Sequence, residues 1–165
     1  MTEITISPAK PDDIPAMSRL LAEMDRFYGS ASADPEEARE QQIYQALFGE
    51  IPVGYALLAR DDAELVGLAA YSFLWPTVGI TRSLYLKELY VADAHQRRGV
   101  GRLLMAALYE IAAEHECSRV EWTTDADNTG AMAFYAELGV PIERSKIFYR
   151  ANNTSGNVSP AGLAG

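Results

Sequence analysis

The middle of this sequence carries a helix pattern between two strand patterns, and this feature limits the fold more than any other. Residues 83–91 (SLYLKELYV) predict one strand, and residues 119–124 predict another. From Gly99 to about His115, apolar side chains recur at helical spacing and predict one buried face, made of Val100, Leu103, Leu104, Ala107, Leu108 and Ile111. Two strands joined through a helix are expected to lie parallel in one sheet. The chain is therefore predicted to be an α/β protein.

Other segments predict that the sheet is mixed and flanked by further helices. Strands are expected over residues 3–7, 55–60, 65–73 and 145–150. The second and third of these should form an antiparallel hairpin, although the acidic connection between them is longer than an ideal tight turn. Helices are expected from a capping Asp12 or Asp13 to Gly29, from Pro35 to near Gly49, and over residues 129–138.

Length and composition indicate one globular domain over residues 1–150 and a mobile tail over residues 151–165. The chain has 165 residues, of which 48% are hydrophobic and 22% charged, and a domain takes roughly 150 residues. A formal charge of -9 disfavours nucleic acid and anionic membranes as partners. The chain lacks an apolar run of about 18 residues and a basic-then-apolar start, so a cytoplasmic location is expected.

The acidic residues are concentrated in the first half of the chain. Residues 1–70 hold 13 acids and 5 bases, whereas residues 71–165 hold 10 acids and 9 bases. A negative field of this kind attracts cations, so the first half would favour a cationic ligand. The alternative is that these acids only keep the protein soluble.

A basic, glycine-containing segment follows the central strand and opens the helix after it. In QRRGVGR (residues 96–102), the first N–H groups of the helix and its dipole favour an anion, and the glycines let a ligand approach the backbone. The alternative is a surface turn with solvated arginines. The segment fits neither a dinucleotide fingerprint, which needs a third glycine where Leu104 stands, nor a phosphate-binding P-loop.

This segment resembles the signature of the GNAT superfamily of N-acetyltransferases, Q/R-x-x-G-x-G/A, in which Gln96, Gly99 and Gly101 fill the pattern. The second half of the family signature is matched by Asn128, by the pair Phe134-Tyr135 six residues on, and by Gly139. The central strand is most similar to the diamine and thialysine acetyltransferase branch. The resemblance implies the GNAT fold, a mixed central sheet flanked by helices whose fourth and fifth strands splay to form a cleft for acetyl-CoA.

The resemblance also implies which residues hold the cofactor. The pyrophosphate would bind at the turn made of Gln96, Arg97, Arg98, Gly99, Val100, Gly101 and Arg102. The backbone of Leu89, Tyr90 and Val91 would hold the pantetheine and the thioester oxygen, and one N–H donor of this kind contributes about 3 kcal/mol in other acyl transfers. Asn128 would bind the pantetheine arm, cap its helix, or do both.

The resemblance implies a general acid, whereas the general base is left open. Tyr135 would protonate the leaving CoA thiolate, and the alternative is a packing role. The diamine branch carries a Glu where this chain has Lys87, and an acid follows at Glu88. Neighbours on a strand face opposite sides, so Glu88 could serve as base or acceptor contact only if the splayed strand relaxes that rule. A structural ion pair for Glu88 and deprotonation through water are the alternatives.

The implied function is direct transfer of an acetyl group from acetyl-CoA to a primary amine in a ternary complex, without a metal. The acidic first half favours a small cationic or lysine-like acceptor. Neither His95 nor His115 has partners at metal-ligand spacing. Transfer of another acyl group from its CoA ester and a non-catalytic CoA-binding regulatory module are the alternative functions. The resemblance also implies a homodimer.

Overall fold

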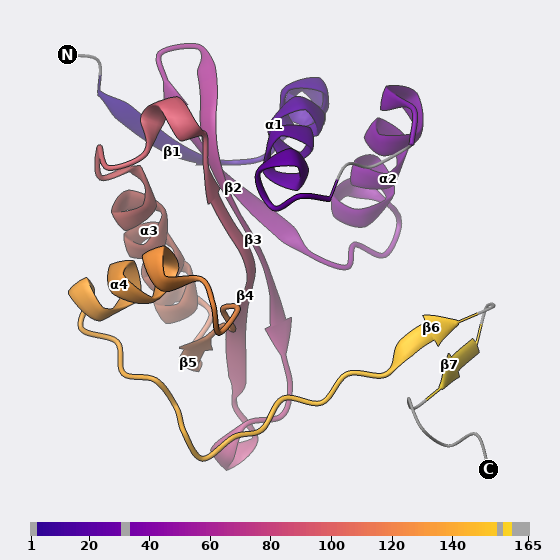
Figure 1. The fold of residues 1–165 in the computed structure, drawn as a ribbon. Coiled ribbons are helices and arrows are strands. Elements are labelled where there is room, and N and C mark those ends of the chain that lie inside the picture. Colours follow the sequence, from indigo (N-terminus) through magenta and orange to yellow (C-terminus); the bar gives the residue numbers. More distant parts are fainter. Residues whose placement is uncertain (1–2, 31–33, 155–156, 160–165) are drawn as a thin grey trace. The chain divides into compact units, whose positions relative to one another are not determined.

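The computed structural model describes residues 3–30, 34–154 and 157–159, and it divides into two units, residues 1–123 and 124–165. The first unit holds a five-stranded sheet in sequence order (Figure 1). Its strands are β1 (Ile4–Pro8), β2 (Tyr55–Asp61), β3 (Glu64–Leu74), β4 (Arg82–Val91) and β5 (Cys117–Glu121). The first three pairings are antiparallel and β4 pairs with β5 in parallel, which confirms the predicted mixed α/β sheet.

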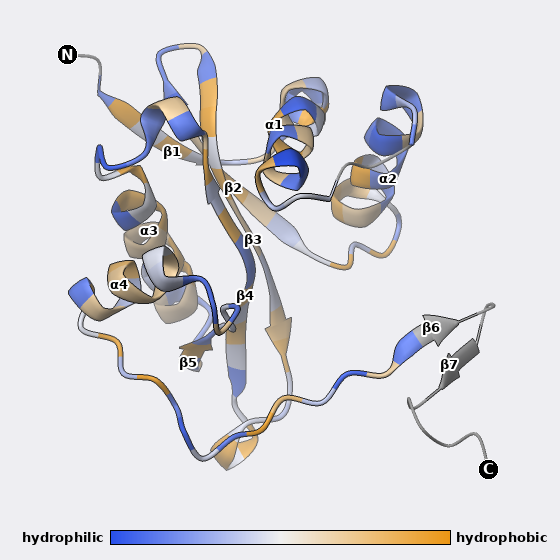
Figure 2. Cartoon of the chain, viewed as in Figure 1, coloured by the Kyte–Doolittle hydropathy of each residue, from blue (hydrophilic) through white to orange (hydrophobic). Residues whose placement is uncertain are grey.

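Helices cover both faces of this sheet. The helices α1 (Ile14–Phe27) and α2 (Glu36–Phe48) lie on one side, and α3 (Val100–Glu114) lies on the other (Figure 1). Met17 and Leu20 of α1 belong to a buried cluster with Leu58 and Leu68 of the sheet. Figure 2 shows hydrophobic and hydrophilic residues interleaved along both α1 and α2, as expected for helices with one face on a core.

The α3 helix packs closely on the other face because β3 carries a glycine there. A Cβ on Gly67 would lie 3.2 Å from Val100 Cγ1. The buried face of α3 is rotated from the predicted one, since Leu103 is exposed while Met105 and Ala112 are buried. The helix therefore begins where the glycine pattern predicts, and its exact packing face depends on the sheet beneath it.

The start of α1 corrects the predicted cap. Asp13 closes a short 3-10 turn, η1 (Pro11–Asp13), and its carboxylate accepts a hydrogen bond from Lys10 N at 2.8 Å and pairs with Arg60. Its side chain makes no capping bond to α1. Pro15 lies at the second position of the helix and has no N–H to be capped.

The β2–β3 hairpin is tighter than predicted. The strands extend into the acidic segment, where Asp61 pairs with Glu64 and leaves only Asp62 and Ala63 in the turn. Asp62 has a φ of 54°, a conformation that two-residue hairpin turns use and that Asp tolerates. Two further short turns, η2 (Val78–Ile80) and η3 (Asp93–His95), flank β4.

The second unit contains α4 (Thr129–Glu137) and a hairpin of β6 (Asn152–Thr154) and β7 (Asn157–Ser159). The predicted strand over residues 145–150 is wrong, because that segment has no strand structure, and its Ile147 and Tyr149 are exposed. An alternating segment becomes a strand only when its backbone pairs with a neighbouring edge, and this one pairs with no described strand. The domain boundary at residue 150 and the mobile tail stay predictions, and residues 155–156 and 160–165 lie outside the described residues.

Candidate functional site

The strands β4 and β5 separate along the sheet, as predicted. Their parallel pairing involves only the first part of β4, where Ser83 pairs with Arg119 and Tyr85 with Glu121. Residues 86–91 continue β4 with partners on β3 but with none on β5. Backbone groups of a strand point alternately to its two sides, so this segment presents N–H and C=O groups on the side that β5 has left. Leu89, Tyr90 and Val91, the predicted thioester-holding residues, lie in this open part of β4.

A β-bulge interrupts β4 at Lys87, next to the candidate base. Ala70 and Tyr71 are neighbours on β3, but their partners on β4 are Glu88 and Leu86, so Lys87 is the extra residue. Paired residues share a face of the sheet, and a bulge shifts the alternation of the strand that carries it. Glu88 therefore shares the face of Ala70, which packs against the α1 cluster. The strand's alternation therefore breaks between Leu86 and Glu88, which face opposite sides of the sheet.

The turn between β4 and α3 has the open backbone that the glycine pattern predicts. Gly99 precedes α3 with a left-handed φ of 81°, and apart from its two chain neighbours no residue has an atom within 4 Å of a Cβ built on it. Arg97 is also left-handed, with a φ of 61°. The first N–H groups of a helix have no partner within the helix. The side chains of Arg97 and Arg102 are exposed near this helix start, so cationic groups and free donors gather there.

Two side chains of this turn are held by protein groups that the sequence analysis did not identify. Gln96 donates from Nε2 to Val91 O at 3.2 Å, which ties the turn to the end of β4. Arg98 donates from Nη1 to Asp61 Oδ2 at 3.0 Å, which ties the turn to the β2–β3 hairpin. Of the three arginines in the turn, Arg98 is therefore held by an ion pair with the hairpin, whereas the side chains of Arg97 and Arg102 are exposed. A guanidinium has five donors, so this ion pair leaves others for an anion.

The end of β4 is also tied to α1 through Glu23. The sequence did not predict this contact. One carboxylate oxygen of Glu23, Oε1, accepts from Tyr90 Oη at 3.0 Å and from Asp93 N at 3.2 Å. Burial and the hydrogen bond to Glu23 raise the pKa of Tyr90 to about 12. No local pattern marks such a pair, because the two side chains are 67 residues apart in the chain.

The remaining predicted residues lie in the second unit, on α4 or next to its ends. Asn128 accepts a hydrogen bond from Ala131 N at 3.1 Å through Oδ1, so the helix-capping role is confirmed. Its amide N–H groups are not used by this bond. Tyr135 is half-buried on α4, with its ring 5.2 Å from that of Phe134. Gly139 follows the helix with a φ of 77° and ends it as predicted.

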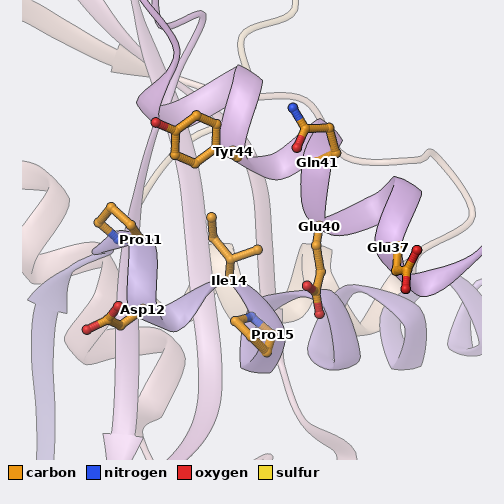
Figure 3. Close-up of a pocket in the computed structure, with 8 residues that line it drawn as sticks. All are labelled: Pro11, Asp12, Ile14, Pro15, Glu37, Glu40, Gln41 and Tyr44. Atoms are coloured by element: carbon orange, nitrogen blue, oxygen red, sulfur yellow. The ribbon is translucent and has the colours of Figure 1, made fainter.

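Several acids of the first half surround an open hollow between the start of α1 and α2 (Figure 3). The hollow has a volume of about 450 Å³, and its lining includes the carboxylates of Asp12, Glu37 and Glu40 and the ring of Tyr44. Other acids of the first half serve the fold, as Asp13 and Glu23 do. The described residues include no group of three or more His, Cys, Asp or Glu that could hold a metal, and none of the described helices could span a membrane.

Comparisons with known proteins agree with this geometry. Residues 17–140 match the acetyltransferase (GNAT) family. A thialysine N-epsilon-acetyltransferase of Sus scrofa is 24% identical over 147 residues, which cover 84% of this chain and 85% of that protein. An integron cassette protein of V. cholerae has a solved structure with a TM-score of 0.85 and 25% identity, covering 94% of this chain and 96% of that one. An aminoglycoside N-acetyltransferase solved with CoA has a TM-score of 0.74 and 19% identity, covering 91% and 95%.

Proposed function

This chain belongs to the acetyltransferase (GNAT) family, and from that premise we propose its acceptor and the residues of its reaction. The protein is an N-acetyltransferase, and the family uses acetyl-CoA as donor. We propose that a small cationic primary amine or a lysine-like side chain receives the acetyl group by direct transfer in a ternary complex. One observation carries the proposal: the open part of β4 is followed, after the short turn η3, by the left-handed Gly99 at the start of α3.

The two ends of this stretch suit the two ends of the donor. At one end, the backbone of Leu89, Tyr90 and Val91 supplies groups that hydrogen-bond the pantetheine and the thioester oxygen. At the other end, the N–H groups of Val100 and Gly101 and the positive end of the helix dipole suit the pyrophosphate. The arginines of the turn add charge, and Asn128 adds amide donors for the pantetheine arm.

The chemistry then needs an acid and a route for the amine proton. The amine nitrogen attacks the thioester carbonyl carbon, so that a C–N bond forms and the C–S bond breaks with its electrons on sulfur. Tyr135 gives its phenolic proton to the departing thiolate and regains one from solvent. The nitrogen loses a proton to Glu88 or through water. The bulge at Lys87 supports Glu88, because it turns that carboxylate to the face that α1 covers.

The cationic acceptor is supported by the acids of α1 and α2. Ile14, which lines the hollow, and Glu23 are nine residues apart on α1, about 13 Å along the helix axis, so the acidic hollow lies well away from the end of β4. Its carboxylates would therefore attract an approaching amine through their field and would not contact the reacting nitrogen. The Sus scrofa relative is named for an N-epsilon acetylation, which supports a lysine-like primary amine.

The test is the release of CoA thiol with a panel of amines that includes polyamines, amino acids, aminoglycosides and peptides. The proposal expects thiol release with acetyl-CoA to be fastest with an amine that carries additional positive charge. Propionyl-CoA in a parallel series tests the alternative acyl donor. Thiol release that no amine in the panel stimulates, although acetyl-CoA binds, would favour the binding module.

Glu88 is tested separately from the acceptor. In Glu88→Gln, a loss of about 10²-fold in the single-turnover rate is expected if the carboxylate takes the proton. Lys87→Gln is the matched control on the neighbouring residue. A rate for Glu88→Gln equal to that of the control would assign the proton transfer to water.

The proposal also includes a cytoplasmic homodimer without a nucleic-acid or membrane partner. The net charge of -9 argues against nucleic-acid and anionic-membrane partners, because phosphate backbones and anionic lipids repel a negatively charged protein. Light scattering tests the assembly, since one chain has a mass of 18.1 kDa. A mass of one chain at micromolar concentration would exclude the dimer.

A further inference from the structure

A single carboxylate oxygen of α1 holds both the last part of β4 and the residue that begins the next turn. Glu23 Oε1 accepts from Tyr90 Oη at 3.0 Å and from Asp93 N at 3.2 Å. The first donor is a side chain of the strand, and the second is backbone of η3. One acceptor oxygen therefore ties both segments to α1.

The surroundings of this anchor bury its phenol end. Tyr90 is 3% exposed, and its ring lies 6.1 Å from that of Phe27, near the end of α1. Raising the pKa of Tyr90 to about 12 keeps the phenol a donor at any physiological pH. Glu23 is half-buried, so the bonds are partly shielded from competing water.

The strand end has other ties, but they come from within the sheet and the turn. Ala92 N donates to Val66 O at 2.8 Å, and Gln96 Nε2 donates to Val91 O at 3.2 Å. These bonds fix the path of the chain as it leaves β4. The contact with Glu23 adds a link to α1, the helix that lies on the face of Glu88.

We propose that Glu23 is a positioning residue for acetyl transfer, acting through Tyr90 and Asp93 on the backbone of residues 89–91. This inference rests on the proposed function, because it assumes that this backbone holds the thioester. A small displacement of groups that bind the reacting carbonyl lowers the rate strongly, by up to about 10²-fold for 1 Å. The pyrophosphate turn keeps its own anchor through Asp61 and Arg98, so cofactor affinity should change less than the rate.

The experiment compares three variants by single-turnover rate, CoA dissociation constant and thermal midpoint. Glu23→Ala removes both hydrogen bonds and is expected to lower the rate about tenfold or more, with less than about a threefold change in the CoA dissociation constant. Glu23→Gln keeps an oxygen that accepts both bonds and is expected to stay within about threefold of the wild-type rate. Glu110→Ala, an exposed glutamate of α3, is the matched control and should leave the rate unchanged.

Two results would overturn the proposal. One is a rate for folded Glu23→Ala equal to that of Glu110→Ala, which would leave Glu23 with a role in stability alone. The other is a rate for Glu23→Gln as low as that for Glu23→Ala, which would assign the effect to charge. Gly99→Asp tests the proposed cofactor site independently of Glu23, because its CoA affinity depends on the turn before α3. Loss of CoA binding in Gly99→Asp together with either result above would overturn the role of Glu23 and leave the proposed cofactor site standing.

Discussion

Asp61, the last residue of β2, accepts a hydrogen bond from Arg98 with 3.0 Å between Oδ2 and Nη1. The β2–β3 hairpin thereby holds one arginine of the turn that we propose for the pyrophosphate. The same carboxylate oxygen lies 3.8 Å from His95 Nε2, so the hairpin contacts the turn at two residues.

Asp61→Ala is therefore expected to weaken CoA binding by about two- to fivefold, because Arg98 loses its orientation. The effect is small because the Arg98 side chain is 41% exposed and such ion pairs contribute at most about 1 kcal/mol. Calorimetry on Asp61→Ala, Arg98→Ala and the double variant measures the coupling. Additive effects of the two substitutions would show that the contact does not assist binding.

Gly99→Asp is expected to abolish measurable CoA binding while the fold is kept. Asp tolerates a left-handed φ, and no neighbouring atom obstructs a Cβ at Gly99, so the substitution mainly places a negative charge beside the proposed anion site. Gly29→Asp is the matched control, because Gly29 has a φ of 78° and equally open surroundings. Equal CoA affinity in the two variants would contradict the assignment of the turn.

Tyr135→Phe is expected to lower the single-turnover rate by ~10²- to 10⁴-fold with little change in acetyl-CoA affinity. The substitution removes the proton donor and keeps the ring that lies beside Phe134. Tyr109→Phe, an exposed tyrosine of α3, controls for the loss of a phenol elsewhere. A rate like that of the control would make Tyr135 a packing residue.

The acids beside the hollow are expected to act through their long-range field. The kcat/KM for a polycationic amine should fall as salt rises, since the Debye length shrinks from ~30 Å at 0.01 M to ~8 Å at 0.15 M. The double variant Glu37→Gln, Glu40→Gln should flatten this dependence. Gln41→Ala is a neutral control on the same helix, and a salt response identical in both variants would show that these acids do not select the substrate.

Because the phenol of Tyr90 is buried, we expect the free energy of unfolding to decline in strong alkali. A pKa raised from 10.0 to about 12 means that the folded protein keeps this proton after the unfolded chain has lost it. The corresponding stability is complete below pH 10 and is lost as pH rises from about 10 to about 12. The loss is on the order of 3 kcal/mol. Urea unfolding of wild type and Tyr90→Phe across this pH range isolates the contribution of the phenol. A difference in unfolding free energy between the two proteins that stays constant with pH would refute the prediction.

Local patterns in the sequence predicted the elements that bear the proposed cofactor site. The central strand and the start of α3 near Gly99 were expected, because hydrophobic periodicity depends on neighbouring residues, whereas the left-handed φ of Gly99 is a finding of the structure. The splay of β4 from β5 followed from the family resemblance and not from any local pattern. The cap by Asn128 was one of two readings that the sequence left open.

Contacts between distant residues could not be predicted in this way. Asp61 and Arg98 are 37 residues apart, and Glu23 and Tyr90 are 67 residues apart, so no spacing rule connects either pair. The bulge at Lys87 depends on the register between two strands, which the sequence of one strand does not contain.

The sequence by itself thus determined the family, the order of the main elements and the residue types at the proposed site. Tertiary structure decided which side of the sheet Glu88 faces and which side chains hold the turn. It also decided that residues 145–150 form no strand, although their alternation predicts one. The physical reason is the same in each case: a strand face, an ion pair and a backbone ladder are each completed by a partner that the chain meets only when folded.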